Sequence, residues 1–180
     1  NKEYGLLPPK GVLSHVTVFE LPMYHKLLVV SDVAVIPYPD LSQKTAIVRY
    51  LTATAKVLGV ECPKIAAIAP SEQLLASVQS SVEAAVLAKM ADRGQLGDVV
   101  LDGPLALDVA LFEEVARTKH LSSPVAGDAD CLLMPNLDAA NVFFKSANHL
   151  CNASLAAMVA GTKAPCVLTS RGDSAESKLY

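Results

Sequence analysis

The sequence predicts an α/β protein in which a mainly parallel, mixed sheet is covered by helices on both faces, giving a three-layer α/β/α arrangement. Short apolar runs alternate along the chain with longer segments whose apolar residues recur at helical spacing. Hydrophobic residues make up 52% of the 180 residues and aromatic residues only 5%, so Ala, Val and Leu must fill the core, as in sheets buried between helices. The first two apolar runs are separated by a short loop and predict an antiparallel pair.

Each element is predicted from its own pattern. Runs of apolar and β-branched residues predict strands over residues 11–20, 27–35, 64–69, 99–101, 131–134 and 166–169. Helical spacing and end signals predict a helix that Asp40 caps at its start and Gly59 at its end, and helices over residues 81–93, 104–118 and 139–160. Pro104 suits the first turn of its helix, where no N–H is needed, and Gly161 would end the last one.

Composition and charge exclude several functions. The formal net charge is −3 and no block of five like charges occurs, so we expect no nucleic-acid partner. No apolar run reaches about 18 residues, and no membrane span is predicted. The cysteines lie among apolar neighbours without a C-x-x-C pair, which predicts buried, reduced thiols and a cytoplasmic setting; they are Cys62, Cys131, Cys151 and Cys166.

Polar turns follow three of the predicted strands. They read Leu101-Asp102-Gly103-Pro104, Met134-Pro135-Asn136-Leu137-Asp138 and Leu168-Thr169-Ser170-Arg171. Ligands of open α/β sheets bind beyond the carboxyl ends of the strands, so we expect all three turns to lie at a ligand site.

The turn at Ser170 and Arg171 is the richest of the three. A helix start offers free N–H groups to an anion, Arg171 adds a bidentate donor suited to phosphate, and Ser170 adds a hydroxyl. The alternative is a plain helix cap beside a solvated arginine. A cap needs only Asp173 or Ser174, so this alternative leaves Arg171 unexplained.

The other two turns supply candidate substrate-binding residues. Asp102 is placed at a strand end, with an N-cap in a tight turn as the alternative reading. Asn136 and Asn141 border the next turn, and Lys145 shares a helix face with Asn141 four residues earlier. Helix capping and surface polarity are the alternative for this second group.

Several common sites are missing from the sequence. The four histidines are scattered and form no Ser/His/Asp arrangement that can be assigned, and no H-E-x-x-H motif occurs. Neither a P-loop motif nor G-x-G-x-x-G is present. We predict no metal site.

Three stretches together resemble the phosphate acetyl/butyryltransferase family. They are Asp-Gly-Pro-Leu-Ala-Leu-Asp from Asp102, Pro-Asn-Leu-Asp-Ala-Ala-Asn from Pro135, and the segment from Lys163-Ala164-Pro165 to Thr169-Ser170-Arg171. The resemblance extends from near the first residue to the last. The sequences VLTSRGDS near the end and AKMADRG at residues 88–94 are more similar to the butyryl branch.

The resemblance implies a two-domain subunit related in fold to isocitrate and isopropylmalate dehydrogenases. Residues 1–164 would be the second, inserted domain, and residues 165–180 a strand and helix start returning to the first domain, most of which is missing. The chain starts at Asn1 rather than methionine and stops as a helix opens, which also predicts a piece of a longer protein. The family's site lies between the domains, so such a piece is expected to be nearly inactive alone. A homodimer built through this domain is also implied, and the helix predicted over residues 139–160 is compatible with its interface or with simple core packing.

The resemblance also implies the reaction, in which acyl-CoA and phosphate give acyl phosphate and CoA without a cofactor. Ser170 and Arg171 would be catalytic, with Thr169 beside them binding substrate. The acetyl branch carries an aspartate a few residues further on as a base for the CoA thiol. Ser177 occupies that position here, with Asp173 and Glu176 nearby, so the base is unassigned.

The middle motif also departs from the family pattern. It has Asn136 and Ala140 where the family usually has an acidic residue and glycine, so we expect the polarity of the pocket at this turn to differ from that of the family. Two other functions remain open. Related domains attached to malic enzymes look like acyl-CoA sensors, although retention of Ser170 and Arg171 favours catalysis. A hydroxyacid dehydrogenase would need a metal-binding aspartate cluster, which the sequence lacks.

Overall fold

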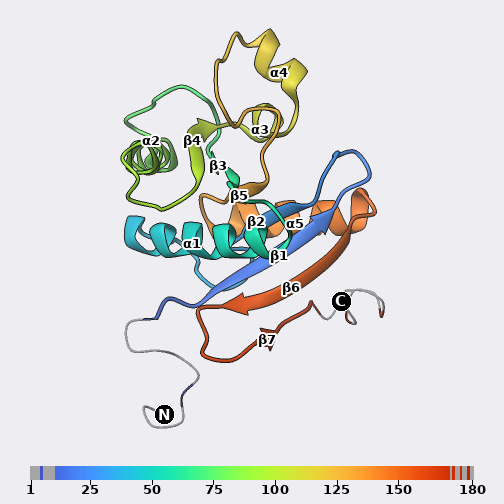
Figure 1. Cartoon of the computed structure of the whole chain (residues 1–180). Coiled ribbons are helices and arrows are strands. Elements are labelled where there is room, and N and C mark those ends of the chain that lie inside the picture. The colour runs from blue at the N-terminus through green and yellow to red at the C-terminus, as the bar shows by residue number, and fades with distance from the viewer. Residues whose placement is uncertain (1–4, 6–10, 171, 173–174, 176–177, 179–180) are drawn as a thin grey trace.

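A seven-stranded sheet in the order β4-β3-β5-β2-β1-β6-β7 organises the chain (Figure 1). The computed structural model describes residues 5, 11–170, 172, 175 and 178. The strands are β1 (Ser14–Glu20), β2 (Leu28–Ser31), β3 (Lys64–Ile68), β4 (Val100–Leu105), β5 (Cys131–Leu133), β6 (Ser154–Ala160) and β7 (Cys166–Val167). The helices are α1 (Leu41–Val57), α2 (Gln79–Asp92), α3 (Leu107–Leu111), α4 (Glu113–Thr118) and α5 (Leu137–Leu150).

The sheet is mixed, with most strands running in one direction. Strands β2, β5, β3 and β4 are parallel neighbours. Strand β1 is antiparallel to both β2 and β6, so β6 shares the direction of β2. The predicted antiparallel pair at the start of the chain is confirmed, with Val16 opposite Ser31.

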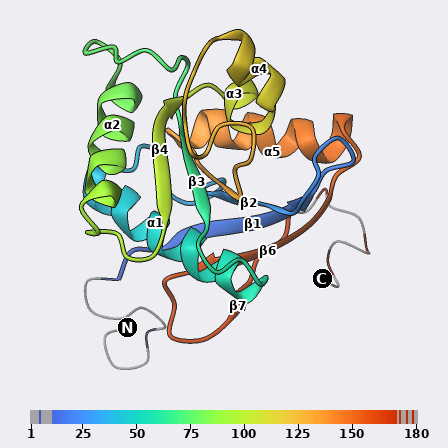
Figure 2. The same cartoon turned by 45° about the horizontal axis from the view of Figure 1, so that its top comes forward.

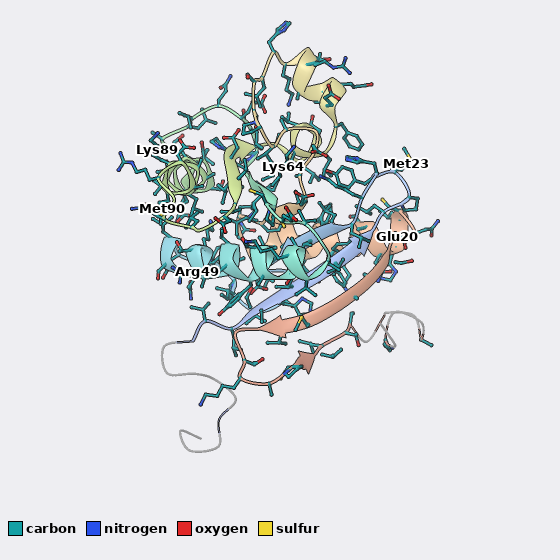
Figure 3. All side chains as sticks on the ribbon, in the orientation of Figure 1. Glu20, Met23, Arg49, Lys64, Lys89 and Met90 are labelled. Carbon is teal, nitrogen blue, oxygen red and sulfur yellow. The ribbon has the colours of Figure 1, made fainter. Side chains whose placement is uncertain are left out.

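Two apolar clusters lie on opposite faces of the sheet, which gives the three layers (Figure 2). Side chains alternate along a strand, and in β2 Val30 packs in the cluster shared with α3, α4 and α5, whereas Val29 packs in the cluster shared with α1 and α2. Lys89 on the outer side of α2 is exposed and projects away from the molecule (Figure 3). The α/β class and the mixed, mostly parallel sheet are therefore confirmed.

Helix α1 begins and ends where the sequence predicts. The Asp40 side chain accepts a hydrogen bond from the Gln43 N–H at 2.8 Å, and the Gln43 side chain accepts one from the Asp40 N–H at 2.9 Å. This reciprocal capping satisfies two N–H groups that the helix cannot pair itself. Gly59 follows the last turn with φ +93°, a conformation that glycine adopts without strain.

The helix predicted over residues 104–118 is wrong in its first part and broken in the middle. Pro104 lies inside β4, after a cis peptide bond with Gly103. Strand β4 is at the edge of the sheet, where a residue without an N–H is tolerated. Phe112 then adopts extended backbone angles between α3 and α4.

The helix predicted over residues 139–160 is also wrong in its second half. Helix α5 ends at Leu150, and Asn152 takes a left-handed conformation with φ 51°. Residues from Ser154 onward form β6, which pairs with β1 along its whole length. The Ala-rich sequence of β6 favours a helix locally, but pairing with β1 overrides that preference. The long helix suggested as compatible with a dimer interface therefore does not exist in this form.

All four cysteines are free thiols, as predicted, but the prediction of burial is correct for one of them only. Cys131 is buried in β5, and this burial raises the pKa of its thiol. Cys62 and Cys151 are exposed, and Cys166 is partly buried. None of the four forms a disulfide.

An ionic cluster lies at the amino ends of the parallel strands. The carboxylate of Asp128 contacts Lys26 at 2.8 Å, Lys64 at 2.7 Å and His25 at 3.0 Å. Burial acts to raise the pKa of Asp128, but hydrogen bonds from the three partners outweigh it and hold this pKa well below its ordinary value. The charged form of Asp128 is therefore stabilised by the fold.

Candidate active site

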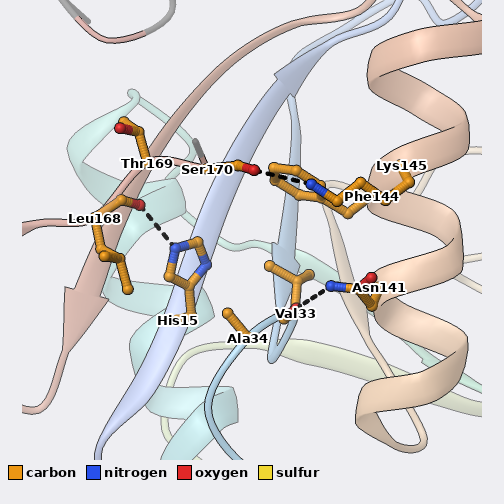
Figure 4. A pocket seen from close by; sticks show the side chains of 9 residues that line it. All are labelled: His15, Val33, Ala34, Asn141, Phe144, Lys145, Leu168, Thr169 and Ser170. Carbon is orange, nitrogen blue, oxygen red and sulfur yellow. Dashed lines mark hydrogen bonds between the residues drawn. The ribbon is translucent and has the colours of Figure 1, made fainter. Parts of the chain in front are cut away.

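A pocket of about 330 Å³ opens on the α5 face of the sheet (Figure 4). Its walls come from the start of β1, the loop after β2, the middle of α5 and the segment that follows β7. The lining residues are His15, Val33, Ala34, Asn141, Phe144, Lys145, Leu168, Thr169 and Ser170. Segments that are far apart in the sequence therefore build one site.

Asp32 holds the loop that forms the floor. This buried carboxylate follows β2 and accepts hydrogen bonds from the N–H groups of Ala34 and Val35, both at 2.8 Å. Its second oxygen accepts from the N–H of Ile36 and from the Ser14 hydroxyl, both at 3.1 Å. Four donors around one carboxylate fix the backbone at Val33 and Ala34.

Helix α5 supplies the opposite wall. Asn136 caps it by accepting a hydrogen bond from the Ala139 N–H at 2.9 Å. Phe144 is buried and makes an edge contact with Phe19 of β1, with ring centroids 5.6 Å apart. This packing fixes the rotation of the helix, so that Asn141 and Lys145 both line the pocket.

Two polar contacts from α5 cross the pocket. The Asn141 amide donates to the Val33 carbonyl at 3.4 Å. The Lys145 ammonium donates to the Ser170 hydroxyl oxygen at 2.9 Å, and it also lies 5.0 Å from the centre of the Phe144 ring. Lys145 thus places a positive charge beside the hydroxyl of Ser170 (Figure 4).

His15 forms the third polar contact. It lies on β1, is only 4% exposed, and its Nε2 is 3.0 Å from the carbonyl oxygen of Leu168. Its Nδ1 is 3.3 Å from the hydroxyl of Thr17. No local sequence pattern singles out this histidine, because its partner is 153 residues away.

Asp32 was missed as well, although a signal was present. Ser31 and Asp32 form a polar pair inside the apolar run LLVVSDVAV. A carboxylate directly after a buried strand must find hydrogen-bond donors, and in an α/β sheet that position is at the ligand end of the strand.

The predicted site residues fall into three groups. Asn141, Lys145, Thr169 and Ser170 line the pocket together. Arg171 lies outside the described residues. Asp102 and Asn136 lie outside this pocket.

Asp102 does not end a strand, because β4 continues to Leu105, and its carboxylate accepts a hydrogen bond from the Gly103 N–H at 2.8 Å. Asn136 lines a separate hollow, together with the buried Lys44 and its partner Glu83. Neither Asp102 nor Asn136 therefore lines the pocket that contains Ser170.

The route of the third turn into the pocket also differs from expectation. Strand β7 is antiparallel to β6 and so runs opposite to β5. Its carboxyl end therefore does not lie at the same edge as those of the parallel strands. The segment at Leu168 instead reaches His15 of β1, although β6 lies between β1 and β7. The chain must leave the sheet and cross the α5 face of β6 to do so.

The pocket combines polar donors with apolar surface. Lys145 and Ser170 can donate hydrogen bonds to an anion, and Val33, Ala34 and Leu168 offer apolar contacts. Within the described ranges, no three His, Cys, Asp or Glu side chains gather closely enough to hold a metal ion. None of the helices in those ranges is long and apolar enough to cross a membrane.

Comparison with known proteins identifies the family of the chain. The family model described as phosphate acetyl/butaryl transferase matches residues 5–180. The chain belongs to this family. It is 43% identical over 179 residues to a phosphate butyryltransferase of Clostridium beijerinckii, and 39% identical over 180 residues to a phosphate acetyltransferase of Thermotoga maritima.

Solved structures agree with the fold. A branched-chain phosphotransacylase from Enterococcus faecalis superposes with a TM-score of 0.89 at 36% identity, over 99% of this chain and 63% of that one. A phosphotransacetylase from Streptococcus pyogenes gives a TM-score of 0.81 at 27% identity, over 96% of this chain and 52% of that one.

The match is one-sided in length. The match to the C. beijerinckii relative includes 99% of this chain but only 59% of that relative. The match to the T. maritima relative includes 100% of this chain and 61% of that relative. This family member thus corresponds to roughly three fifths of the relatives' length, and their remaining segments have no counterpart in it.

Proposed function

We propose that the protein containing this chain transfers a short acyl group between CoA and phosphate, so that acyl-CoA and phosphate give acyl phosphate and CoA. Butyryl is the acyl group favoured by the VLTSRGDS segment, and the C. beijerinckii relative is named a phosphate butyryltransferase. CoA and phosphate are substrates, and the reaction needs no resident cofactor.

The observation that carries the proposal is the contact between Lys145 and Ser170. The motif Thr169-Ser170-Arg171 supplies two hydroxyls and a guanidinium, and α5 brings a further cation to 2.9 Å from the Ser170 oxygen. Two anionic substrates must be held together for this reaction, and positive charge at their meeting point lowers the cost of bringing them into contact.

Each residue has a role in this proposal. Arg171 holds the phosphate or acyl phosphate by its bidentate fork, and Lys145 offsets the charge on the oxygen atoms nearest Ser170. Ser170 positions the thiol or the leaving phosphate, while Thr169 and Asn141 contact substrate at the two sides of the pocket.

The chemical step needs no covalent enzyme intermediate. A phosphate oxygen attacks the thioester carbonyl carbon, the carbonyl oxygen takes up negative charge, and the carbon–sulfur bond then breaks to release CoA thiolate. In the reverse direction a base takes the thiol proton. Asp173, Glu176 and Ser177 are the nearby candidates in sequence, and all three lie outside the described residues, so the base is unassigned.

The larger organisation belongs to the same proposal. In this proposal, residues 1–164 form the second domain and residues 165–180 return to a first domain. The first domain completes the cleft and contributes to the specificity for the acyl chain. The fold relation to isocitrate and isopropylmalate dehydrogenases, the homodimer, the cytoplasmic setting and the substrate contacts of Asp102 and Asn136 stay predictions.

A coupled assay of the complete protein tests the function. Butyryl phosphate and CoA are supplied, and formation of the thioester is followed by its absorbance. We expect turnover, and a fall of about 100-fold or more in kcat for Ser170→Ala, the scale seen when one catalytic hydrogen-bonding group is removed. The matched control, Ser42→Ala on the exposed side of α1, should keep wild-type kcat. Absence of thioester formation by the wild-type protein with butyryl and acetyl phosphate would refute the proposal.

A further inference from the structure

The segment that carries Thr169 and Ser170 is not held by the sheet. Strand β7 pairs with β6 at only two positions, Val167 opposite Met158 and Cys166 opposite Val159. After Val167 the chain leaves this ladder and crosses β6 toward β1 and α5. Its place in the pocket therefore depends on side-chain contacts rather than on strand pairing.

Two of these contacts come from opposite sides of the pocket (Figure 4). Lys145 reaches Ser170 from α5, at 2.9 Å. His15 reaches the Leu168 carbonyl from β1, at 3.0 Å, two residues before Ser170. The His15 contact involves the backbone and so acts on the path of the chain, whereas the Lys145 contact acts on one side chain.

The partner of His15 determines which nitrogen of its ring carries the hydrogen. A carbonyl oxygen can only accept, so Nε2 of His15 must carry the hydrogen. In the neutral ring Nδ1 is then an acceptor, and the Thr17 hydroxyl, 3.3 Å away and fully buried, donates to it. Thr17 thereby favours the tautomer that can bind Leu168.

Packing restricts the ring further. His15 is 4% exposed, and its backbone is paired with Val159 of β6 in a seven-residue ladder. A buried histidine with both nitrogens engaged is a fixed donor rather than a freely turning one. It lines the same pocket as Ser170.

We propose that His15 is a positioning residue for acyl transfer, which sets the backbone path at Leu168 and thereby the placement of Ser170. The inference rests on the proposed function of the Ser170 turn. Since misplacing a reacting group by about 1 Å can cost about 100-fold in rate, loss of this hydrogen bond is expected to act on turnover.

The test compares three variants of the complete protein by steady-state kinetics. His15→Leu removes the donor and keeps a buried apolar side chain, and we expect kcat to fall about 10- to 100-fold. His15→Gln retains an N–H donor and should recover at least half of that loss on a logarithmic scale. His149→Leu makes the same change at an exposed histidine of α5 and should keep wild-type kcat.

Two readouts separate positioning from a general loss of stability. His15→Leu and His15→Gln should have similar melting temperatures, although their kcat values differ. Amide hydrogen exchange at residues 168–170 should be about tenfold faster in His15→Leu than in the wild type, because the anchoring contact is lost.

If His15→Leu keeps the wild-type kcat, His15 does not have this role. The role is also overturned if His15→Leu and His15→Gln lose kcat equally and the loss in kcat parallels the loss in melting temperature. Unchanged exchange at residues 168–170 would overturn it too. A wild-type protein without acyl transfer would refute the proposed function instead, and hydrogen exchange would still report on the anchor.

Discussion

Replacing Lys145 by methionine removes the ammonium group that contacts Ser170 and leaves most of the side-chain volume in place. The Lys145 ammonium group lies 5.0 Å from the centre of the Phe144 ring and 2.9 Å from the Ser170 oxygen. Methionine is unbranched and of similar length, so Lys145→Met tests the charge and the hydrogen bond rather than the packing of α5.

The size of the effect can be worked from that distance. A substrate oxygen that hydrogen-bonds to Ser170 at about 3 Å lies within about 6 Å of the Lys145 nitrogen. Two unit charges about 6 Å apart interact by roughly 3 kcal/mol at an effective dielectric constant of about 20. Such a loss corresponds to about a 100-fold fall in kcat/KM, and salt lowers it because the pocket is open to solvent.

Steady-state kinetics of the complete protein at low and high ionic strength measure this effect. We expect kcat/KM of Lys145→Met to be about 100-fold below wild type at low salt, with a smaller gap at high salt. Lys145→Arg keeps the charge and should lie between the two. Lys89→Met removes an exposed lysine of α2 and serves as the control. A value of kcat/KM within threefold of wild type for Lys145→Met at low salt would contradict the role assigned to this residue.

Two further predictions concern stability, measured as the melting temperature. The pKa of Asp128 lies below its ordinary value, because hydrogen bonds from its basic partners outweigh the opposing effect of burial, so its contribution is present above about pH 4 and is lost as the pH falls. Wild type should therefore lose more melting temperature between pH 6 and pH 3 than Asp128→Asn, and parallel curves would contradict the assignment. Gly161→Ala should destabilise the protein by about 2 kcal/mol or more, because Gly161 has φ +87° and a Cβ there would overlap the Val12 carbonyl oxygen. Gly97→Ala, with φ +85° and open space, isolates the cost of the backbone angle, and an equal loss in both variants would show that the contact with Val12 does not matter.

Elements with their own local signals were predictable. Helix α1 carries a capping pair at Asp40 and Gln43 and a glycine after its last turn, and tertiary packing only confirms what these residues favour. Strand β6 is the opposite case, since nothing in its Ala-rich sequence distinguishes it from the end of α5. Asn152 was the available signal, because asparagine is the commonest residue after glycine to end a helix in a left-handed conformation.

The site was predictable to the extent that it lies on one element. Asn141 and Lys145 are four residues apart on α5, so their common face follows from helix geometry. His15 and Asp32 could not be found this way. Their contacts depend on the pairing of β1 with β2 and β6, which joins segments separated by up to about 150 residues.

Strand β1 explains why these distant segments form one site. Because β1 is antiparallel to β2, its first residues lie beside the carboxyl end of β2, where Asp32 holds the pocket floor. The same residues of β1 pair with the end of β6, beside which β7 begins. His15 therefore lies within reach of both the floor and the Ser170 segment, a position that an all-parallel sheet would not provide. A change in the β1 register would move the donor for Leu168 and the floor together, so we attribute the geometry of the site to this antiparallel strand as much as to the Ser170 motif itself.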